Sequence, residues 1–488
     1  MRFNNLGLLL LCLIIGTLAT AQRFSTLVTF DGANGASPNQ LAQALDGNLY
    51  GTTGYGGGGG RGTVFKVTPT GQLSPLFSFC PSMHQCLDGA QPVAGLVLGD
   101  VYGNLYGTTW EGGANDLCCG GGGTLFQIRP TDGILSTVHS FCARINCTDG
   151  ARPQGLTFGF NGQFFGVLNG GGATDHGGLF KISGASHTET TYSICQSGPP
   201  CANGDTPQDT LIQATDGNFY GVTSDGGANG YGTIFRMTPN GVITTLYSFC
   251  SQTNCADGAH PNRGLVQATD GDFYGTTPYG GVGSTCSSGN CGTVFKMTRS
   301  AVVTTLYSFC TQANCTDGNV PNSALLQATD GNFYGTTFLG GTNYGAGTVF
   351  RITPSGILTT IYNFCPTSPC TDGYNPASLV QHTNGSIYGT TIYGGINSDG
   401  VIFSLSMDLP AFVESFPYAA AVGKTVKILG QGLTATTVVA FNGTTATFTV
   451  PSDTYLNATV PSGATTGYIT VTTPSGTLMS NKRFQVIP

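Results

Sequence analysis

The sequence predicts an all-β protein built largely from one repeated unit. Of its 488 residues, 76 are glycine, 20 are tyrosine, 29 are phenylalanine, and only 8% are charged. This composition is too aromatic and too weakly charged for a disordered chain, and its glycines lack the three-residue period of collagen. One aromatic position recurs at intervals of 54 to 60 residues, which is typical of propellers, solenoids and other repeat arrays. The seven anchors are Tyr50, Tyr106, Phe165, Tyr220, Tyr274, Tyr334 and Tyr388.

Each repeat contains four strand-sized segments. In the best-preserved copy these are residues 264–268, 273–277, 292–297 and 303–309. An Asp-Gly or Asn-Gly pair between the first two segments predicts a tight hairpin, because both turn residues need positive φ. A T-P-x-G turn joins the third and fourth segments in several copies. Four short antiparallel strands repeated seven times predict a seven-bladed β-propeller. A β-solenoid is the main alternative.

The two ends of the repeat region complement each other. The last repeat ends after residues 401–407 without its fourth segment, whereas residues 25–30 resemble a fourth segment that lacks the preceding three. We therefore expect the N-terminal strand to complete the seventh blade and to close the ring by strand exchange. A solenoid would not need this offset.

Residues 1–21 have the features of a secretory signal peptide. Arg2 precedes an apolar run at residues 8–15, and small residues follow at Ala19 and Ala21, as at a cleavage site. The run is shorter than the roughly 20 residues that span a membrane. We expect cleavage, no transmembrane anchor afterwards, and a secreted, cell-surface or periplasmic location.

The cysteines that follow the signal peptide predict disulfides. Sixteen of the 17 cysteines lie there, an even number in an exported chain. The second Cys or His pair that completes a zinc site is absent. The adjacent Cys118 and Cys119 leave their pairing open. The predicted local pairs are Cys80/Cys86, Cys142/Cys147, Cys195/Cys201, Cys250/Cys255, Cys286/Cys291, Cys310/Cys315 and Cys365/Cys370.

The order of the connections predicts two different faces. In an up-and-down blade, the first and third connections share one rim, so the tight turns form one plain face. The glycine-rich loops and the cysteine-bearing loops share the other rim. Because binding residues are concentrated on loops held by a rigid scaffold, we expect any ligand site on the loop-rich face.

The composition changes after residue 407. Cysteine is absent, and short Val- and Thr-rich segments alternate with Pro and Gly turns, which predicts a small β-sandwich. Residues Phe416-Pro417, Gly430, Gly432 and Asn442-Gly443 resemble the IPT/TIG family of immunoglobulin-like domains. That resemblance implies a spacer or an interaction module. The expected domains are the signal peptide (1–21), the propeller (22–407) and the IPT/TIG-like domain (408–488).

The repeat itself is similar to the GloVer tandem repeat of exported bacterial "choice-of-anchor" proteins. The family core, D-G-N-x-Y-G-T-T followed by G-T-V-F-x-x-T-P-x-G, is present from Asp330 to Gly356. The third copy departs most, with Phe165-Gly166-Val167-Leu168. The resemblance implies export and a surface context, and it supplies no catalytic residue.

Few residues suggest catalysis or cofactor binding. A net charge of −7 with only 17 Lys and Arg argues against a nucleic-acid partner. The G-x-G-x-x-G at residues 57–62 lacks the helix that a dinucleotide site needs, and we expect no cofactor and no metal. The weak catalytic candidates are Glu111, Asp225 and His176. His84 and His260, in cysteine loops, have no evident partner in the sequence, and we expect them to be surface residues.

Aromatic residues near the predicted loop-rich rim are the better candidates. Tyr55, Trp110, Tyr279 and Tyr393 follow the second strand of their repeats, and exposed rings suit stacking on sugars or peptide side chains. Packing between blades is the alternative. We therefore predict an exported, non-catalytic binding or scaffold protein that recognises a glycan or a surface protein. A polysaccharide hydrolase or lyase and a purely structural envelope component are the alternatives.

Overall fold

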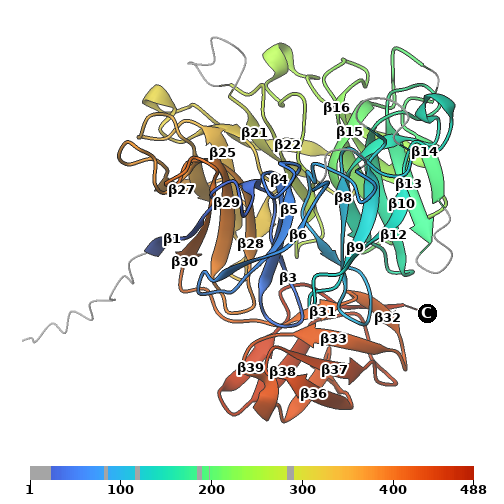
Figure 1. Ribbon diagram of the computed structural model, residues 1–488, viewed down its shortest axis with the longest axis vertical. Helices are drawn as coiled ribbons and strands as arrows, with labels where there is room; N and C mark the ends of the chain where they lie inside the picture. Colours follow the sequence, from blue (N-terminus) through green and yellow to red (C-terminus); the bar gives the residue numbers. More distant parts are fainter. Residues whose placement is uncertain are drawn as a thin grey trace, which may run out of the picture.

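The structure is a computed structural model that describes residues 23–81, 86–115, 121–183, 189–196, 198–282 and 291–487. These residues form strands and turns and contain no α-helix, only four short 3-10 turns. The all-β prediction is therefore confirmed. Figure 1 shows a larger part that runs from blue to orange, with the C-terminal part, in red, against one end of it.

Within the described residues, the larger part contains seven antiparallel sheets, numbered here in chain order. Sheet 1 contains β2 (Ala36–Pro38), β3 (Ala42–Gln43), β4 (Leu49–Tyr55), β5 (Thr63–Val67) and β6 (Leu73–Ser78). Sheet 2 contains β7 (Val97–Leu98), β8 (Leu105–Thr109), β9 (Thr124–Ile128) and β10 (Leu135–Ser140). Sheet 3 contains β11 (Ala151–Phe158), β12 (Gln163–Gly170), β13 (Gly178–Ser183) and β14 (Glu189–Ser193).

The remaining four sheets repeat this order. Sheet 4 contains β15 (Asp205–Gln213), β16 (Phe219–Asp225), β17 (Thr233–Met237) and β18 (Ile243–Ser248). Sheet 5 contains β19 (Val266–Gln267), β20 (Phe273–Thr277), β21 (Thr293–Met297) and β22 (Val303–Ser308). Sheet 6 contains β23 (Asn319–Pro321), β24 (Leu326–Gln327), β25 (Phe333–Leu339), β26 (Thr348–Ile352) and β27 (Leu358–Asn363). Sheet 7 contains β28 (Tyr374–Gln381), β29 (Ile387–Tyr393), β30 (Val401–Ser406) and β1 (Arg23–Thr29).

The N-terminal strand completes the last sheet. β1 pairs antiparallel with β30, from Arg23 opposite Ser406 to Thr29 opposite Val401. The ring of Phe24 also stacks on Tyr362 of sheet 6, with the ring centroids 3.8 Å apart. The predicted pairing of the N-terminal segment with the last repeat is therefore confirmed.

Apolar clusters join each sheet to the next one. Phe165 and Leu179 of sheet 3, for example, pack in one buried cluster with Phe219 and Phe235 of sheet 4. The same kind of cluster joins sheet 7 to sheet 1, where Ile402 packs with Phe65 and their neighbours. Burial between facing sheets explains why these strands carry so little charge, because unpaired charges are costly to bury.

The glycine of the Y-G-T-T motif makes room for this packing. A Cβ atom at Gly51 would lie only 2.6 Å from Cζ of Phe65 on the adjacent strand. Equivalent glycine and phenylalanine pairs recur in the other sheets, as at Gly275 and Phe295, where the distance is also 2.6 Å. The glycine of this motif is therefore needed so that the phenylalanine of the adjacent strand can pack against it.

The C-terminal part contains two four-stranded sheets around a separate core. The core includes Val426, Ile428, Val439, Leu456 and Val471, all buried. One sheet contains β31 (Glu414–Phe416), β33 (Thr425–Leu429), β37 (Tyr455–Thr459) and β36 (Phe448–Ser452). The other contains β35 (Thr444–Thr445), β34 (Val438–Phe441), β38 (Ile469–Thr473) and β39 (Gly476–Met479). β32 (Ala419–Ala421) pairs in parallel with β40 (Gln485–Ile487).

The C-terminal part contacts the tight-turn face of the larger part. The Oγ1 atom of Thr454 donates to the carbonyl oxygen of Leu45 at 2.6 Å. Phe416 stacks on Phe158 with ring centroids 5.4 Å apart. At Gly47, a Cβ atom would lie 2.7 Å from Cγ2 of Thr454. The sequence predicted a plain face here, but it did not predict that this face would hold the C-terminal part. The long loops of the larger part gather at the other end (Figure 1).

Candidate functional site

Short disulfides close the loops that follow the fourth strands. The structure confirms six predicted pairs, and Cys291 of the seventh pair is disulfide-bonded while Cys286 lies outside the described residues. Cys118, Cys119 and His84 also lie outside the described residues. The six confirmed bonds join Cys80 to Cys86, Cys142 to Cys147, Cys195 to Cys201, Cys250 to Cys255, Cys310 to Cys315 and Cys365 to Cys370.

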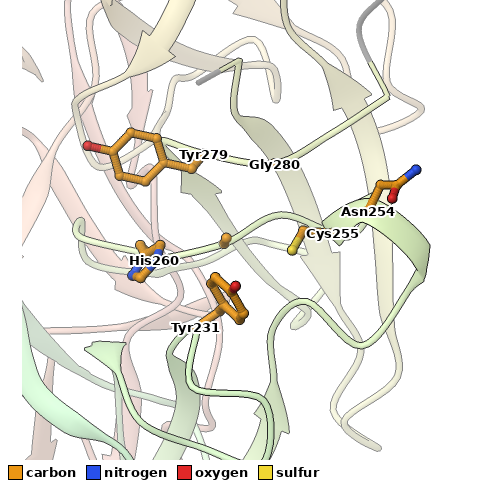
Figure 2. Close-up of a pocket in the computed structure, with 7 residues that line it drawn as sticks. Tyr231, Asn254, Cys255, His260, Tyr279 and Gly280 are labelled. Atoms are coloured by element: carbon orange, nitrogen blue, oxygen red, sulfur yellow. The ribbon is translucent and has the colours of Figure 1, made fainter. Parts of the chain in front are cut away.

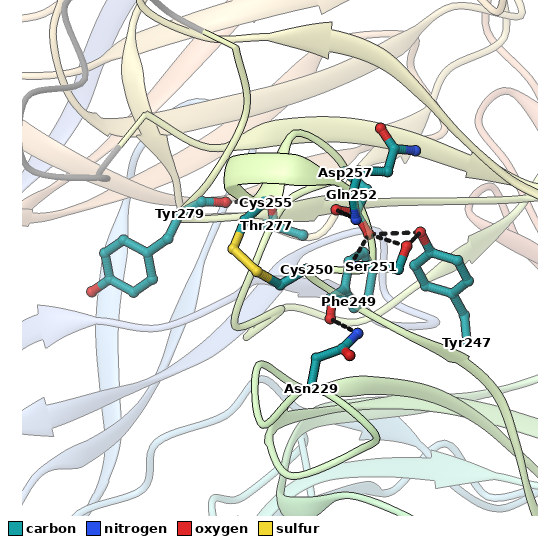
Figure 3. Close-up of a disulfide and its surroundings, with 10 residues drawn as sticks. All are labelled: Asn229, Tyr247, Phe249, Cys250, Ser251, Gln252, Cys255, Asp257, Thr277 and Tyr279. Carbon is teal, nitrogen blue, oxygen red and sulfur yellow. Dashed lines mark hydrogen bonds between the residues drawn. A yellow bond between two sulfur atoms is a disulfide. The ribbon is translucent and has the colours of Figure 1, made fainter.

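A buried aspartate organises the inside of these loops, as Figure 3 shows for the Cys250–Cys255 loop. Oδ2 of Asp257 accepts hydrogen bonds from the Tyr247 hydroxyl at 2.6 Å and from the Ser251 hydroxyl at 2.8 Å. Its Oδ1 accepts from the backbone N–H of Gln252 at 3.1 Å. Burial alone would raise the pKa of Asp257, but these hydrogen bonds outweigh it and lower that pKa. Burial, together with this carboxylate, raises the pKa of Tyr247 to about 12.

The same arrangement recurs in other copies. Asp317 accepts from the Tyr307 hydroxyl at 2.8 Å, and Asp372 accepts from the Tyr362 hydroxyl at 2.8 Å. The role of these aspartates was not predicted from the sequence. Neither were the short 3-10 turns at Ile145–Cys147, Thr253–Cys255 and Ala313–Cys315. In these three copies a disulfide and a carboxylate therefore hold the loop together.

One residue of each sheet, just before a proline, has the same uncommon backbone conformation. Non-glycine residues with positive φ are rare, yet these seven have φ between 49° and 56°. The backbone N–H of each donates to a carbonyl oxygen of the preceding sheet's loop, as from His260 to Tyr231 at 2.8 Å. The bond from Ser37 to Asp399, also 2.8 Å, joins sheet 1 to sheet 7. The seven residues are Ser37, Gln91, Arg152, Thr206, His260, Val320 and Asn375.

His260 has partners on both sides of the boundary between sheets 4 and 5. Its Nδ1 lies 2.9 Å from the carbonyl oxygen of Ser224 and 3.2 Å from Oδ1 of Asp225. Its ring meets those of Tyr231 and Tyr279 edge to face, with centroids 5.2 Å and 5.7 Å away. The sequence showed no partner for His260 and suggested a surface position, whereas the structure half-buries its ring among these residues. Its partners are distant in sequence, and only its place before a proline could have marked it.

These side chains border a cavity of about 350 Å³, shown in Figure 2. Oδ2 of Asp225 accepts from the hydroxyls of Ser224 at 2.7 Å and Thr206 at 2.8 Å, so the carboxylate beside His260 is firmly held. His260 thus contacts both Asp225, a predicted catalytic candidate, and Tyr279, a predicted binding residue. The cavity is lined by Tyr231, Asn254, Cys255, Ala259, His260, Tyr279 and Gly280.

The other two catalytic candidates have different partners. Oε2 of Glu111 lies 3.2 Å from Nη1 of Arg61, and Nδ1 of His176 lies 2.9 Å from Oδ2 of Asp205. Glu111, His176 and Asp225 therefore belong to three separate pairs, which do not favour the hydrolase or lyase alternative. Donor atoms of His176, Cys195 and Cys201 lie within 4.8 Å of one another. Because the two sulfurs form a disulfide, they are not the thiolates that bind a metal.

Three of the four predicted aromatic residues are exposed. The exposed fractions are 55% for Tyr55, 39% for Tyr279 and 43% for Tyr393. Trp110 is half-buried, and the guanidinium of Arg152 lies 5.8 Å from its ring centroid. Sequence reasoning missed Tyr231, which is 41% exposed. Over the described ranges, the chain has no helix that is long and apolar enough to cross a membrane.

Comparison with protein families identifies the repeat. The Gloeobacter/Verrucomicrobia repeat matches residues 14–146, 120–325 and 282–447, and the IPT/TIG domain matches residues 410–486. The chain belongs to the Gloeobacter/Verrucomicrobia repeat family and carries an IPT/TIG domain. Both resemblances seen in the sequence are confirmed. A comparison with curated protein sequences found no match.

Solved structures with a similar fold are distant in sequence. The extracellular domain of the hybrid two-component system BT4673 from B. thetaiotaomicron is 11% identical, with a TM-score of 0.51 over 84% of this chain. The present chain covers 46% of that chain. A fungal alcohol oxidase of the AA5 family, in complex with copper, is 13% identical with a TM-score of 0.49, over 93% of this chain and 100% of that one. At such identities the likeness concerns the fold alone.

Proposed function

We propose that the seven sheets are the blades of a seven-bladed β-propeller of residues 22–407, closed by strand exchange at β1. Three observations support closure. β1 completes sheet 7, an apolar cluster joins sheet 7 to sheet 1, and the bond from Ser37 to Asp399 repeats there the contact found between other neighbouring sheets. Residues 408–488 would then form an immunoglobulin-like β-sandwich attached to the tight-turn face.

The disulfides support export of this protein. Such bonds persist in oxidising compartments and are rare in the cytosol, and six are present among the described residues. The proposal includes cleavage of residues 1–21 as a signal peptide. The mature chain would act outside the cytoplasm.

The function that the geometry supports best is non-catalytic glycan binding at the loop-rich face. The observation that carries this proposal is the exposure of three tyrosines at or just after the end of the second strand of their sheets, namely Tyr55, Tyr279 and Tyr393. Exposed rings on rigid loops present apolar faces with little conformational entropy to lose on binding. The C-terminal domain contacts the opposite face, so the loop-rich face is the one left for a large ligand.

A glycan array with the mature protein, residues 22–488, tests this function. We expect defined glycans to bind, and we expect the triple variant Tyr55→Ala, Tyr279→Ala, Tyr393→Ala to bind at least about tenfold more weakly. The matched control is Tyr102→Ala, because Tyr102 is 86% exposed but lies in the tight turn between β7 and β8. The absence of any bound glycan, or an equal loss in the control, would contradict the proposal.

A further inference from the structure

The cavity at His260 lies where three segments of two neighbouring sheets meet. Tyr231 comes from the loop between β16 and β17 of sheet 4, and Tyr279 follows β20 of sheet 5. Asn254, Cys255 and His260 belong to the disulfide-pinned connection between the two sheets. The volume of about 350 Å³ is at the lower end of the range for small-molecule sites, which is roughly 300–1,000 Å³.

We propose that this cavity binds one neutral pyranose unit of a glycan, with Nε2 of His260 accepting a hydrogen bond from a sugar hydroxyl. The inference rests on the proposed glycan-binding function and places one subsite of it. It also adds two residues, Tyr231 and His260, that the sequence did not indicate as binding residues.

The hydrogen bonds of His260 define what its ring offers to a ligand. A carbonyl oxygen only accepts hydrogen bonds, so the 2.9 Å contact with Ser224 requires the hydrogen of His260 to be on Nδ1. In the neutral ring, Nε2 is then an acceptor. The contacts of the ring with Ser224 and Asp225 both involve Nδ1 and leave Nε2 out. A sugar hydroxyl, which carries a donor hydrogen, can complete this position.

The two tyrosines place apolar rings beside the imidazole of His260. Their planes lie at 72° and 86° to the His260 ring, for Tyr231 and Tyr279 respectively, so both rings stand nearly perpendicular to it at the edge of the cavity (Figure 2). Both tyrosines are partly exposed, which leaves ring surface for the C–H groups of a sugar. A Cβ atom at Gly280 would lie 2.6 Å from the carbonyl oxygen of Cys255, so a larger residue does not fit there without a shift.

The charges around the cavity favour a neutral sugar over a uronic acid. Neither Lys nor Arg is among the lining residues. The nearest charged partner of His260 is the carboxylate of Asp225, whose side chain is 49% exposed. A second carboxylate brought to this cavity would meet the like charge of Asp225, and no Lys or Arg lines the cavity to balance it. Specificity for neutral pyranoses therefore follows from the residues present.

Ligand-observed NMR titration of the mature protein with matched methyl pyranosides and methyl uronates tests the inference. We expect at least one of the methyl glucoside, galactoside and mannoside to bind, and its uronate to bind several-fold more weakly. His260→Asn and Tyr231→Ala should each weaken that binding by up to about tenfold, as expected for one hydrogen bond or one stacking wall. Asn is chosen because it tolerates positive φ, and thermal melting checks that each variant is folded.

The control and the array separate this inference from the general function. Tyr102→Ala should bind the pyranoside like the unchanged protein. If a pyranoside binds but neither cavity variant weakens it, or if the uronates bind more tightly, this subsite assignment is overturned. If the array shows glycan binding that is insensitive to both cavity variants, the inference fails and the proposed function stands. If no glycan or pyranoside binds at all, both fail.

Discussion

The hydroxyl of Tyr274 donates a hydrogen bond to Oδ2 of Asp270, 2.8 Å away. This bond joins the repeat's aromatic anchor to its tight turn, and burial is the main reason why the pKa of Tyr274 is raised. In the third copy, Phe165 has no hydroxyl and Asn161 replaces the aspartate, so both partners are changed together. The seventh copy keeps Tyr388 but has Asn384 at the aspartate position. Equivalent bonds join Tyr50 to Asp46, Tyr106 to Asp100, Tyr220 to Asp216 and Tyr334 to Asp330.

Tyr274→Phe should destabilise the protein because it removes this bond and keeps the buried ring. We expect a loss of about 1.5–3 kcal/mol in the free energy of unfolding, the usual range for a hydrogen bond to a charged group. Thermal melting of the variant and of a Tyr102→Phe control measures it. If the unchanged protein, Tyr274→Phe and Tyr102→Phe all melt at the same temperature, the bond does not contribute to stability.

The protein should lose stability at acid pH when Asp257 becomes protonated. Hydrogen bonds keep the pKa of Asp257 below its ordinary value of 3.8 despite the opposing effect of burial. Its contribution to stability is therefore complete above the unfolded value and is lost as the pH falls through the lower folded pKa. In melting curves recorded against pH, Asp257→Asn should lower the melting temperature at neutral pH and reduce the decline below pH 3.8. A variant with an unchanged pH profile would contradict this role.

Deleting residues 23–30 should destabilise the larger part more than an ordinary loss of N-terminal residues. The deletion removes β1, leaves the edge of β30 unpaired and uncovers the rings that Phe24 packs against. We expect a markedly lower melting temperature and aggregation through the exposed edge. A chain that begins at Arg23 is the control. An unaltered melting temperature in the deletion variant would refute closure by strand exchange.

The sequence predicted the features that depend on local spacing. The expected second strand of the fifth repeat, residues 273–277, coincides with β20, and the cysteine pairs are five or six residues apart. The first strand expected at residues 264–268 is shorter, since only Val266 and Gln267 pair as β19. Short-range patterns carry this information because strand pairing and short disulfides within one repeat involve nearby residues.

The candidate site was less predictable because its residues come from different repeats. His260 and the Ser224 carbonyl are 36 positions apart in the chain, and the pair forms only when sheets 4 and 5 pack together. The position of the C-terminal domain also depends on contacts across the whole chain, such as that of Thr454 with Leu45. Nothing in the local pattern of either segment indicates the other.

The seven residues before proline share one backbone conformation, yet they are seven different amino acids. Because their backbone N–H groups make the structural bonds, their side chains are not required for those bonds. Exchanging residues at these positions, among types that tolerate positive φ, would change the chemistry at the boundaries between sheets while keeping the framework. Asn375 is the exception, because it is buried and its side chain donates to the carbonyl oxygen of Phe338. The fold thus offers six separately adjustable positions, and a library randomised only there would generate new recognition surfaces on one unchanged scaffold.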